Sequence, residues 1–529
     1  MRKIGSFLSA ALAAATLVGA GIALAQPRHG GTLTMMVEPE PPTLLTGVTT
    51  SASTLAVTAK VTEGLLSYDF ELKPRPQLAT AWHVSADGLT YRFELRRNVK
   101  WHDGRSFSAR DVAFSIRTMQ QVHPRGRTTF ANVKDIATPD DHTVVLSLSQ
   151  PAPYLLYALA ATETPIVPEH VYKGDASRFD ANPNARSPVG TGPFVFKEWV
   201  RGSHIVYERN PDYWDKPKPY VDRIIVRVIP DAAARSVAIE TGAIDLALNT
   251  PVPPSELQRL QSVPHLGFET DGYQYNNYLA RMEFNLERET LAKREVREAI
   301  VRAIDREALL RVVFYGYGDI SDGPISPGLK RFYAPAPRIG FDPALAEQIL
   351  DRAGLARKPN GTRFALTLDY IPSGGDTYKR SAEFIKQSLA KVGIDVTVRS
   401  QDYSAYVRRV YTERDFDFTV HFTSNLFDPT IGVQRLFWSK NFRKGVPFSN
   451  GSAYNNPEVD RLLEAAAVEA DEKKRFEHFA AFQKKIAEDL PDFALIGLKY
   501  VTIYNKRVVD HTMGANGASE NLANVYLKN

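Results

Sequence analysis

Apolar and polar residues alternate along several short stretches of this chain, which is the pattern of half-buried β-strands. Apolar positions between Phe194 and Tyr207 stand on both sides of a break at Arg201-Gly202 and predict a β-hairpin. The β-branched run Arg223–Ile229 predicts a third strand after it. Gly190-Thr191-Gly192-Pro193 precedes the hairpin and predicts a sharp change of chain direction.

The same reading predicts strands elsewhere in the chain. They are expected at Gly30–Met36, around Tyr91, Phe93 and Leu95, around Val144, Leu146 and Leu148, at Ala243–Leu248 and at Val501–Tyr504.

Helices are indicated by apolar residues at spacings of three and four and by their capping residues. Ser108 is expected to cap one helix, and Asp342-Pro343 and Asn456-Pro457 to begin two more. Another helix is expected at Ala232–Thr241. Val296, Ile300, Ile304 and Leu309 are expected to form the face of one helix, and Phe476, Phe479, Phe482 and Ile486 the buried side of another.

Strands and helices alternate between Phe364 and Phe422, with a helix around Ala382–Val392 between two strands. Such an order is typical of βαβ units, so parallel connections are expected to dominate here, with helices on both faces of the sheet. The fold class that follows is α/β.

Composition supports a large soluble protein. The 529 residues are enough for two or more domains, and 43% hydrophobic with 24% charged residues is ordinary for a globular chain. The net charge of +5 falls to +3 without Arg2 and Lys3, which is too mild to indicate nucleic acid. The chain has no cysteine, so disulfides, thiolate metal sites and cysteine nucleophiles are excluded.

Residues 1–25 are expected to be a signal peptide. Arg2 and Lys3 are followed by an apolar run, and Ala23-Leu24-Ala25 fits a cleavage site before Gln26. A membrane anchor is the alternative, because the run is nearly long enough to span a bilayer. With the leader removed, the periplasm is the expected location.

Several blocks together resemble the family 5 extracellular solute-binding proteins of ABC importers. They are G-T-G-P-F from Gly190, the hairpin, N-P-D-Y-W from Asn210 and V-D-R-I-I-V-R-V-I-P-D from Val221, with a further block at Leu78–Ser115. The resemblance implies a two-lobed periplasmic-binding-protein (type II) fold with an extra inserted domain and mixed sheets flanked by helices. It implies lobe I at 26–60, 187–275 and 500–529, an inserted domain II at 61–186 and lobe III at 276–499.

The loop from Phe422 to Pro429 resembles the family segment that holds a ligand's amino end. Dipeptide binders have an aspartate three positions before the Asp-Pro pair, where this chain has the neutral Asn425. They also offer an arginine near the position of Tyr370–Gly375, and none stands here. Asp428, of the Asp-Pro pair, could replace the missing aspartate or cap a turn.

The hydroxyl-rich stretch Thr49–Thr54 can either bond a ligand or cap the helix that follows. The expected ligand-binding residues are Thr50, Ser51, Tyr370, Ser373, Asn425, Asp428 and Trp438.

Motifs for catalysis are absent from the sequence: there is no G-x-S-x-G, no H-E-x-x-H and no phosphate-binding loop with lysine. His83, His102 and Asp103 fit no metal-ligand spacing. We therefore expect neither an enzyme nor a cofactor.

The expected function is that of a monomeric solute receptor working with a permease and ATPases. Its leading ligand is a longer peptide held by main-chain hydrogen bonds. A sugar conjugate, an opine-like compound or a metal chelate is the alternative, and a secreted hydrolase or a periplasmic chaperone is a further one.

Overall fold

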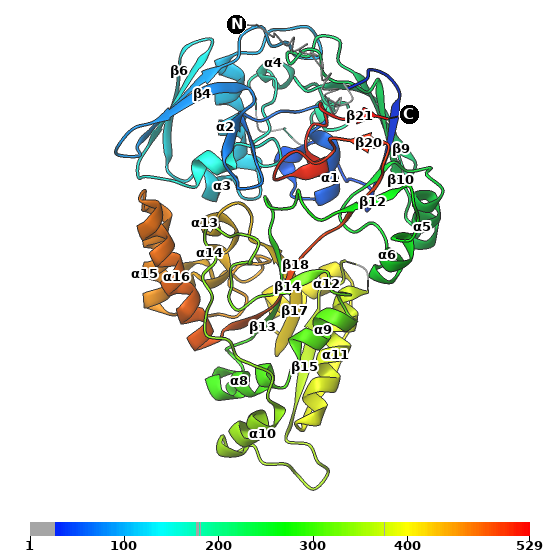
Figure 1. Ribbon diagram of the computed structural model, residues 1–529. Coiled ribbons are helices and arrows are strands. Elements are labelled where there is room, and N and C mark those ends of the chain that lie inside the picture. The colour runs from blue at the N-terminus through cyan, green and yellow to red at the C-terminus, as the bar shows by residue number, and fades with distance from the viewer. Residues whose placement is uncertain (1–26, 176–178, 180, 375, 529) are drawn as a thin grey trace, which may run out of the picture.

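The computed structural model describes residues 27–175, 179, 181–374 and 376–528, which form three bodies, each built on its own β-sheet (Figure 1). We call the body with the seven-stranded sheet lobe I, the one with the four-stranded sheet domain II and the one with the six-stranded sheet lobe III. Lobe I and domain II lie side by side at one end of the molecule, and lobe III forms the other end. The expected leader lies outside the described residues.

Lobe I is assembled from separate stretches of the chain, because its strand order is β12-β19-β11-β1-β10-β9-β8. The predicted hairpin is confirmed as the antiparallel pair β8 and β9, and β10 continues the sheet in parallel with β1. β19 lies between β11 and β12, so the end of the chain returns to the sheet that holds its beginning. The strands are β1 (Thr32–Val37), β8 (Phe194–Val200), β9 (His204–Arg209), β10 (Arg223–Val228), β11 (Leu246–Ala247), β12 (Leu266–Glu269) and β19 (Thr502–Asn505).

The glycines before β8 are needed because two backbones approach closely there. A Cβ on Gly190 would lie 1.9 Å from the carbonyl oxygen of Val61, and one on Gly192 would lie 2.6 Å from it. The amide of Gly192 donates to this same oxygen at 2.8 Å. His102 holds the segment from the other side, since its Nε2 donates to the Gly192 oxygen at 2.9 Å.

Domain II is an antiparallel sheet in the order β4-β5-β7-β6 with helix α2 (Ala109–Val122) packed beside it. The predicted cap of α2 is confirmed: the amide of Ser108 donates to the Asp111 carboxylate at 2.8 Å. The strands are β4 (Ala79–Val84), β5 (Thr90–Leu95), β6 (Val133–Asp140) and β7 (Thr143–Leu148), and two short helices are α3 (Gly126–Thr129) and α4 (Glu169–Tyr172).

Lobe III has a mixed sheet in the order β14-β18-β13-β17-β15-β16. Only β17, β15 and β16 pair in parallel, and the other three pairings are antiparallel. The expectation that parallel connections dominate is therefore wrong, because β13 and β18 meet from distant parts of the chain instead of through a crossover helix. The strands are β13 (Tyr278–Phe284), β14 (Gly318–Ile320), β15 (Phe364–Tyr370), β16 (Ile394–Arg399), β17 (Phe418–Ser424) and β18 (Asp492–Leu498).

The single helix expected over 296–309 is also wrong, since two helices, α8 (Arg294–Arg302) and α9 (Arg306–Val312), stand there. Asp305 separates them, and its carboxylate accepts the amide of Ala308 at 2.9 Å as the N-cap of α9. The apolar spacing runs across the break because both helices cover the same core.

Other helix starts agree with the sequence. Asp342 caps α10 (Pro343–Arg352) and Asn456 caps α15 (Pro457–Val468), both with proline in the first turn. On α16 (Glu472–Asp489), Phe479, Phe482 and Ile486 are buried, but Phe476 is only half-buried. The remaining larger helices are α1 (Ala52–Thr58), α5 (Ala232–Glu240), α6 (Pro254–Leu260) and α11 (Thr377–Lys391).

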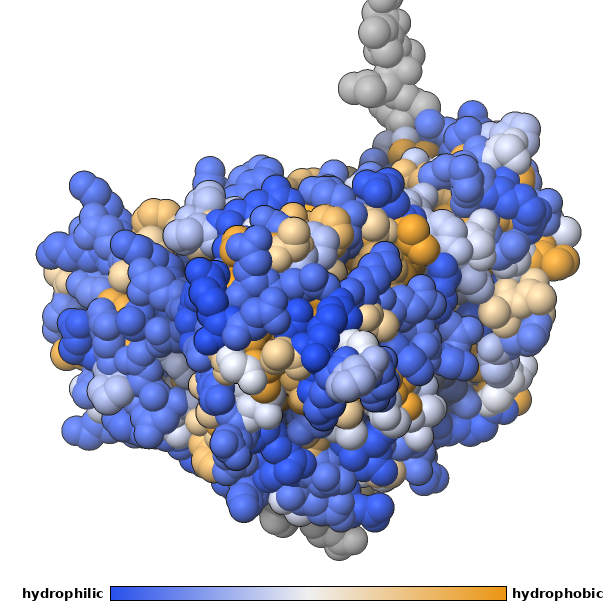
Figure 2. Space-filling model, turned by 90° about the horizontal axis from the view of Figure 1, so that it is seen from below, coloured by the Kyte–Doolittle hydropathy of each residue, from blue (hydrophilic) through white to orange (hydrophobic). Residues whose placement is uncertain are grey.

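The surface of lobe III seen end-on is mainly hydrophilic, with apolar residues scattered over it (Figure 2). Within the described residues, no helix has the length and apolar character needed to cross a bilayer.

Candidate functional site

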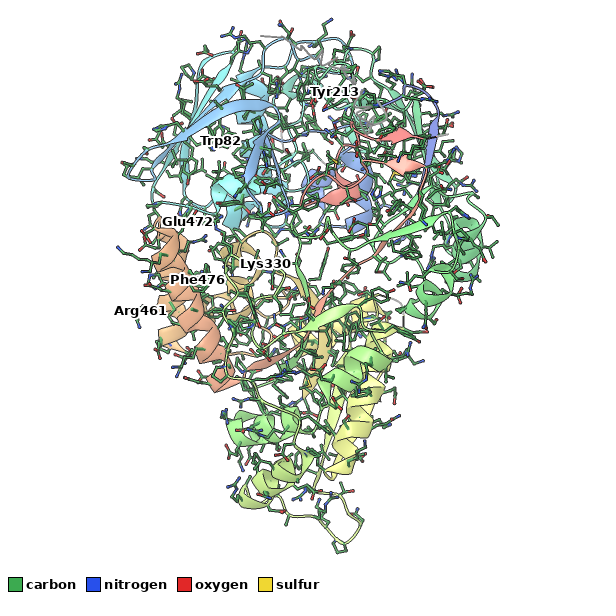
Figure 3. All side chains as sticks on the ribbon, in the orientation of Figure 1. Trp82, Tyr213, Lys330, Arg461, Glu472 and Phe476 are labelled. Atoms are coloured by element: carbon green, nitrogen blue, oxygen red, sulfur yellow. The ribbon has the colours of Figure 1, made fainter. Side chains whose placement is uncertain are left out.

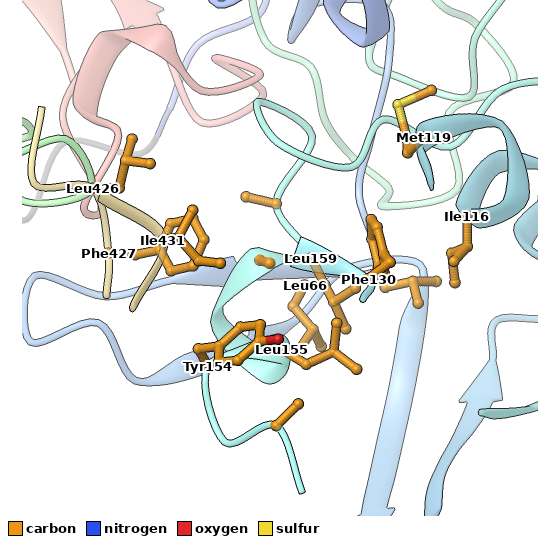
Figure 4. Packing of buried hydrophobic residues seen from close by; sticks show 14 of the residues in the cluster. Leu66, Ile116, Met119, Phe130, Tyr154, Leu155, Leu159, Leu426, Phe427 and Ile431 are labelled. Atoms are coloured by element: carbon orange, nitrogen blue, oxygen red, sulfur yellow. The ribbon is translucent and has the colours of Figure 1, made fainter. Parts of the chain in front are cut away.

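Domain II and lobe III meet through one continuous apolar core. The loop after β17 and the short helices α13 (Pro429–Gly432) and α14 (Gln434–Phe437) bring Leu426, Phe427 and Ile431 into the same cluster as Tyr154 and Leu155 of domain II (Figure 4). The two bodies thus lie against each other with a dry contact.

Tyr275 marks the place where the chain passes between the bodies. Its hydroxyl donates to the Tyr157 oxygen of domain II at 2.7 Å, and its ring centroid lies 4.9 Å from that of Phe427 and 5.5 Å from that of Tyr68.

On the domain II side of this contact stands a bidentate ion pair. Arg125 donates from Nε and Nη2 to the two carboxylate oxygens of Glu163 at 2.8 and 2.6 Å. Burial disfavours the ionised carboxylate, but the charge of Arg125 outweighs burial and lowers the pKa of Glu163. Arg125 also lies close enough to Tyr278 for its charge to oppose the rise that burial causes in the pKa of that hydroxyl.

Aromatic rings line the neighbouring part of lobe III. The ring of Tyr278 lies 5.0 Å from Tyr500 and 6.0 Å from Phe422, and Phe422 stacks on Tyr378 at 5.2 Å. Tyr273 adds a further contact, 5.7 Å from Tyr500. Tyr378 is buried, whereas the other four rings are half-buried and keep some of their surface reachable. Such rings can pack against apolar side chains and offer hydroxyls to polar groups.

The sheet of lobe III turns polar side chains toward α13 and α14. Arg281 and His421 stand opposite each other on β13 and β17, and Thr423 is two residues further along β17. Arg281 Nη1, His421 Nδ1 and Thr423 Oγ1 are buried without a hydrogen-bond partner. The sequence offered a weak signal for this set, since polar residues alternate with apolar ones inside a strand that was expected to be buried.

Asn425 is fully buried and its amide is already engaged. Its Oδ1 accepts the amide of Ser326 at 2.5 Å, and its Nδ2 donates to the Pro324 oxygen at 3.4 Å. The side chain thus ties the loop to the 324–326 segment, and it does not have a free polar atom for a solute in this arrangement.

Asp428 is likewise committed to the protein. Both of its carboxylate oxygens accept from Arg475 of α16, at 2.6 and 2.7 Å, and one also accepts the amide of Thr430 at 2.9 Å as the cap of α13. Of the two roles left open for Asp428, the structure shows the cap.

The other expected site residues lie apart from this loop. Tyr370 is buried in the lobe III core, where its hydroxyl bonds that of Ser400 at 2.7 Å, and Ser373 is half-buried on the loop after β15. Trp438 donates its indole N–H to Glu464 at 2.9 Å.

In lobe I, Thr50 is exposed and Ser51 occupies the N-cap position of α1. The hydroxyl of Ser51 makes no capping hydrogen bond and instead bonds Ser53 at 3.0 Å. Within the described residues, no hydrogen bond joins any two of the seven expected site residues.

A cavity of about 210 Å³ lies elsewhere, between lobe I, domain II and the C-terminal segment. Trp214, Thr162 and Glu520 are among its lining residues, and Figure 3 places the neighbouring Tyr213 in this upper half of the molecule. All lining residues come from lobe I and domain II, so the cavity is separate from the contact with lobe III.

Beside this cavity the buried Glu63 accepts hydrogen bonds from Trp214 at 2.9 Å, Thr191 at 2.9 Å and Tyr213 at 3.0 Å. Burial outweighs these donors and raises the pKa of Glu63 to about 7.

Comparisons with known proteins agree with this architecture. The model of the bacterial extracellular solute-binding proteins, family 5 Middle, matches residues 73–443. The oligopeptide-binding protein AppA of Bacillus subtilis is 28% identical over 482 residues, which cover 88% of this chain and 86% of the relative.

Solved structures match over nearly the whole length. The structure of B. subtilis AppA in complex with a nonapeptide has a TM-score of 0.80 and 26% identity, covering 95% of this chain and 100% of that one. AgaA of A. tumefaciens R10 in complex with agropinic acid has a TM-score of 0.77 and 27% identity, covering 94% and 99%. The fold is the two-lobed one of periplasmic binding proteins.

Proposed function

Because the chain belongs to the bacterial extracellular solute-binding proteins of family 5, we propose that it captures a peptide between lobe III and the bodies opposite it. The likeness to AppA with its nonapeptide, which extends over 95% of the chain, is the observation that carries this proposal. The protein acts by binding and release and not by catalysis.

The binding mechanism is closure of the two ends of the molecule about the segments that connect them. The chain crosses between lobe I and lobe III near Tyr273 and again near Tyr500, and these two rings contact each other at 5.7 Å. Rotation about such a pair of crossings opens and closes a cleft, and closure buries the solute. An extended peptide is then held by main-chain hydrogen bonds, while the half-buried rings contact its side chains.

The location and partners follow from the family and from the sequence. We infer that residues 1–25 are removed after Ala25, that the mature monomer works in the periplasm, and that it hands its solute to a permease and ATPases of an ABC importer. The domain boundaries at 60/61, 186/187, 275/276 and 499/500 are part of this proposal, as is a contribution of Thr50, Ser51 and Ser373 to the cleft.

A non-peptide organic acid is the second candidate solute. The likeness to AgaA with agropinic acid favours it, and so does the absence from Asn425 of the charge that would bind a peptide ammonium.

The direct test is to identify what the protein carries. The mature chain is purified without denaturant, then unfolded, and the released molecules are analysed by mass spectrometry. The proposal predicts peptides near one molecule per chain, recovered unchanged after incubation with the refolded protein. Cleavage of the peptide would indicate a hydrolase, and binding at many sites would indicate a chaperone.

A further inference from the structure

The short helix α14 presents a charged residue to the contact between domain II and lobe III. Its Leu436 and Phe437 belong to the apolar core shared with domain II. Gln434 and Arg435, on the same helix turn, are half-buried, and Gln434 Oε1 has no hydrogen-bond partner. The backbone here is held in place, since the Arg435 oxygen accepts from Asn441 Nδ2 at 2.7 Å and from the amide of Asn450 at 3.0 Å.

The guanidinium of Arg435 has no carboxylate partner among the described residues. Its one hydrogen bond runs from Nε to the Gly432 oxygen at 3.3 Å, a contact within the same turn. Arginine carries five N–H donors, so most of its hydrogen-bonding capacity is unused.

Nearby acids are already taken by other arginines. The groups whose charge acts on Arg435 include Arg125, Arg281 and Glu163. Glu163 is bound in both oxygens by Arg125, and Arg281 is paired with Asp492 at 2.5 Å. Burial first, and then the charges of the other two arginines, lower the pKa of Arg435 to about 10. A buried cation without a partner is costly, and an anion placed beside it recovers that cost.

We propose that Arg435 binds a carboxylate of the captured solute and thereby selects solutes that carry one. The Oε1 of Gln434 lies on the same helix and supplies an acceptor for a neighbouring N–H of the solute. This inference rests on the proposed function, and it moves the carboxylate anchor from the Tyr370–Ser373 region, where the sequence offers no arginine, to α14.

Calorimetry with defined probes tests the proposal. A tripeptide library is prepared as free acids and as C-terminal amides, and a third library carries an internal glutamate with both ends blocked. Wild type is predicted to bind free acids at least tenfold more tightly than amides. If the carboxylate comes from a side chain, the third library binds as the free acids do.

Arg435→Met removes the charge and keeps much of the side-chain volume. It is predicted to weaken binding of the preferred carboxylate library tenfold or more and to leave amides within twofold. The matched control is Arg461→Met, on the outer face of α15, where the arginine is exposed (Figure 3); it is predicted to bind all libraries as wild type does.

Thermal unfolding of the solute-free variants separates binding from a structural role. The melting temperature of Arg435→Met is predicted to equal or exceed that of wild type, because an uncompensated buried charge is removed. A lowered melting temperature, or unchanged affinity for free acids, would overturn the role of Arg435 while peptide capture stands. If wild type binds none of the libraries, peptide capture itself is wrong, and the carboxylate anchor for peptides is wrong with it.

Discussion

Single buried side chains in this protein hold segments together that are far apart in the sequence. Glu63 receives donors from Thr191, Tyr213 and Trp214 and so connects the start of domain II with the chain that leaves it. Its ionised form is disfavoured by burial, so folding favours the protonated acid, with a pKa of about 7.

This pKa predicts how stability changes with pH. Between the unfolded value of about 4.3 and 7, the folded state holds a proton that the unfolded state has lost, so the free energy of unfolding falls as pH rises. The loss is complete above pH 7 and is on the order of 3 kcal/mol. Glu63→Gln is expected to reduce this slope in urea titrations from pH 4.5 to 7.5. A slope equal to that of wild type would mean that Glu63 stays ionised.

Asn425 gives a second prediction. Asn425→Asp replaces the Nδ2 donor to Pro324 by a carboxylate oxygen, which would face a carbonyl oxygen in a buried place. The expected loss of stability is about 1–3 kcal/mol, measured by urea unfolding without solute. An Asp variant that is as stable as wild type and gains affinity for free amines would show that this side chain turns to the solute.

Elements are joined across lobe III by the pair of Asp428 and Arg475, which fastens the start of α13 to α16. Both side chains are buried, and removal of one partner of such a pair typically costs about 3–5 kcal/mol. Asp428→Asn is therefore expected to lower stability in this range. The double variant Asp428→Asn with Arg475→Gln is expected to recover part of the loss. Loss of peptide binding with unchanged stability would instead make Asp428 a solute ligand.

The elements themselves were largely predictable, because strands such as β5 and caps such as Asp342 depend on local patterns. The division between α8 and α9 was missed, since apolar spacing continues over Asp305 while its capping preference ends the first helix. Sheet direction in lobe III was also missed, because pairing of β13 with β18 depends on contacts between residues about 210 positions apart.

The candidate site was less predictable than the fold. A sequence motif can indicate the loop 422–429 but not that Asn425 and Asp428 spend their polar atoms on Ser326 and Arg475. Equally, nothing local distinguishes Arg435 from a surface arginine. Its lack of a partner depends on which arginines Glu163 and Asp492 already bind, and only the folded arrangement decides this.

The molecule as a whole consists of two ends connected near Tyr273 and Tyr500, and our central claim is that a solute binds between these ends and draws them together. A ligand that binds the folded closed state also stabilises it by mass action. The melting temperature is therefore expected to rise with solute concentration, in step with the closure.

Small-angle X-ray scattering of the mature protein, with and without the solute that mass spectrometry identifies, tests this claim most directly. We predict a smaller radius of gyration at saturating solute with an unchanged forward scattering, which corresponds to closure of a monomer. The solute at the same concentration with an unrelated protein of similar size is the control. A radius of gyration that stays the same at full occupancy would contradict binding by closure of the two ends.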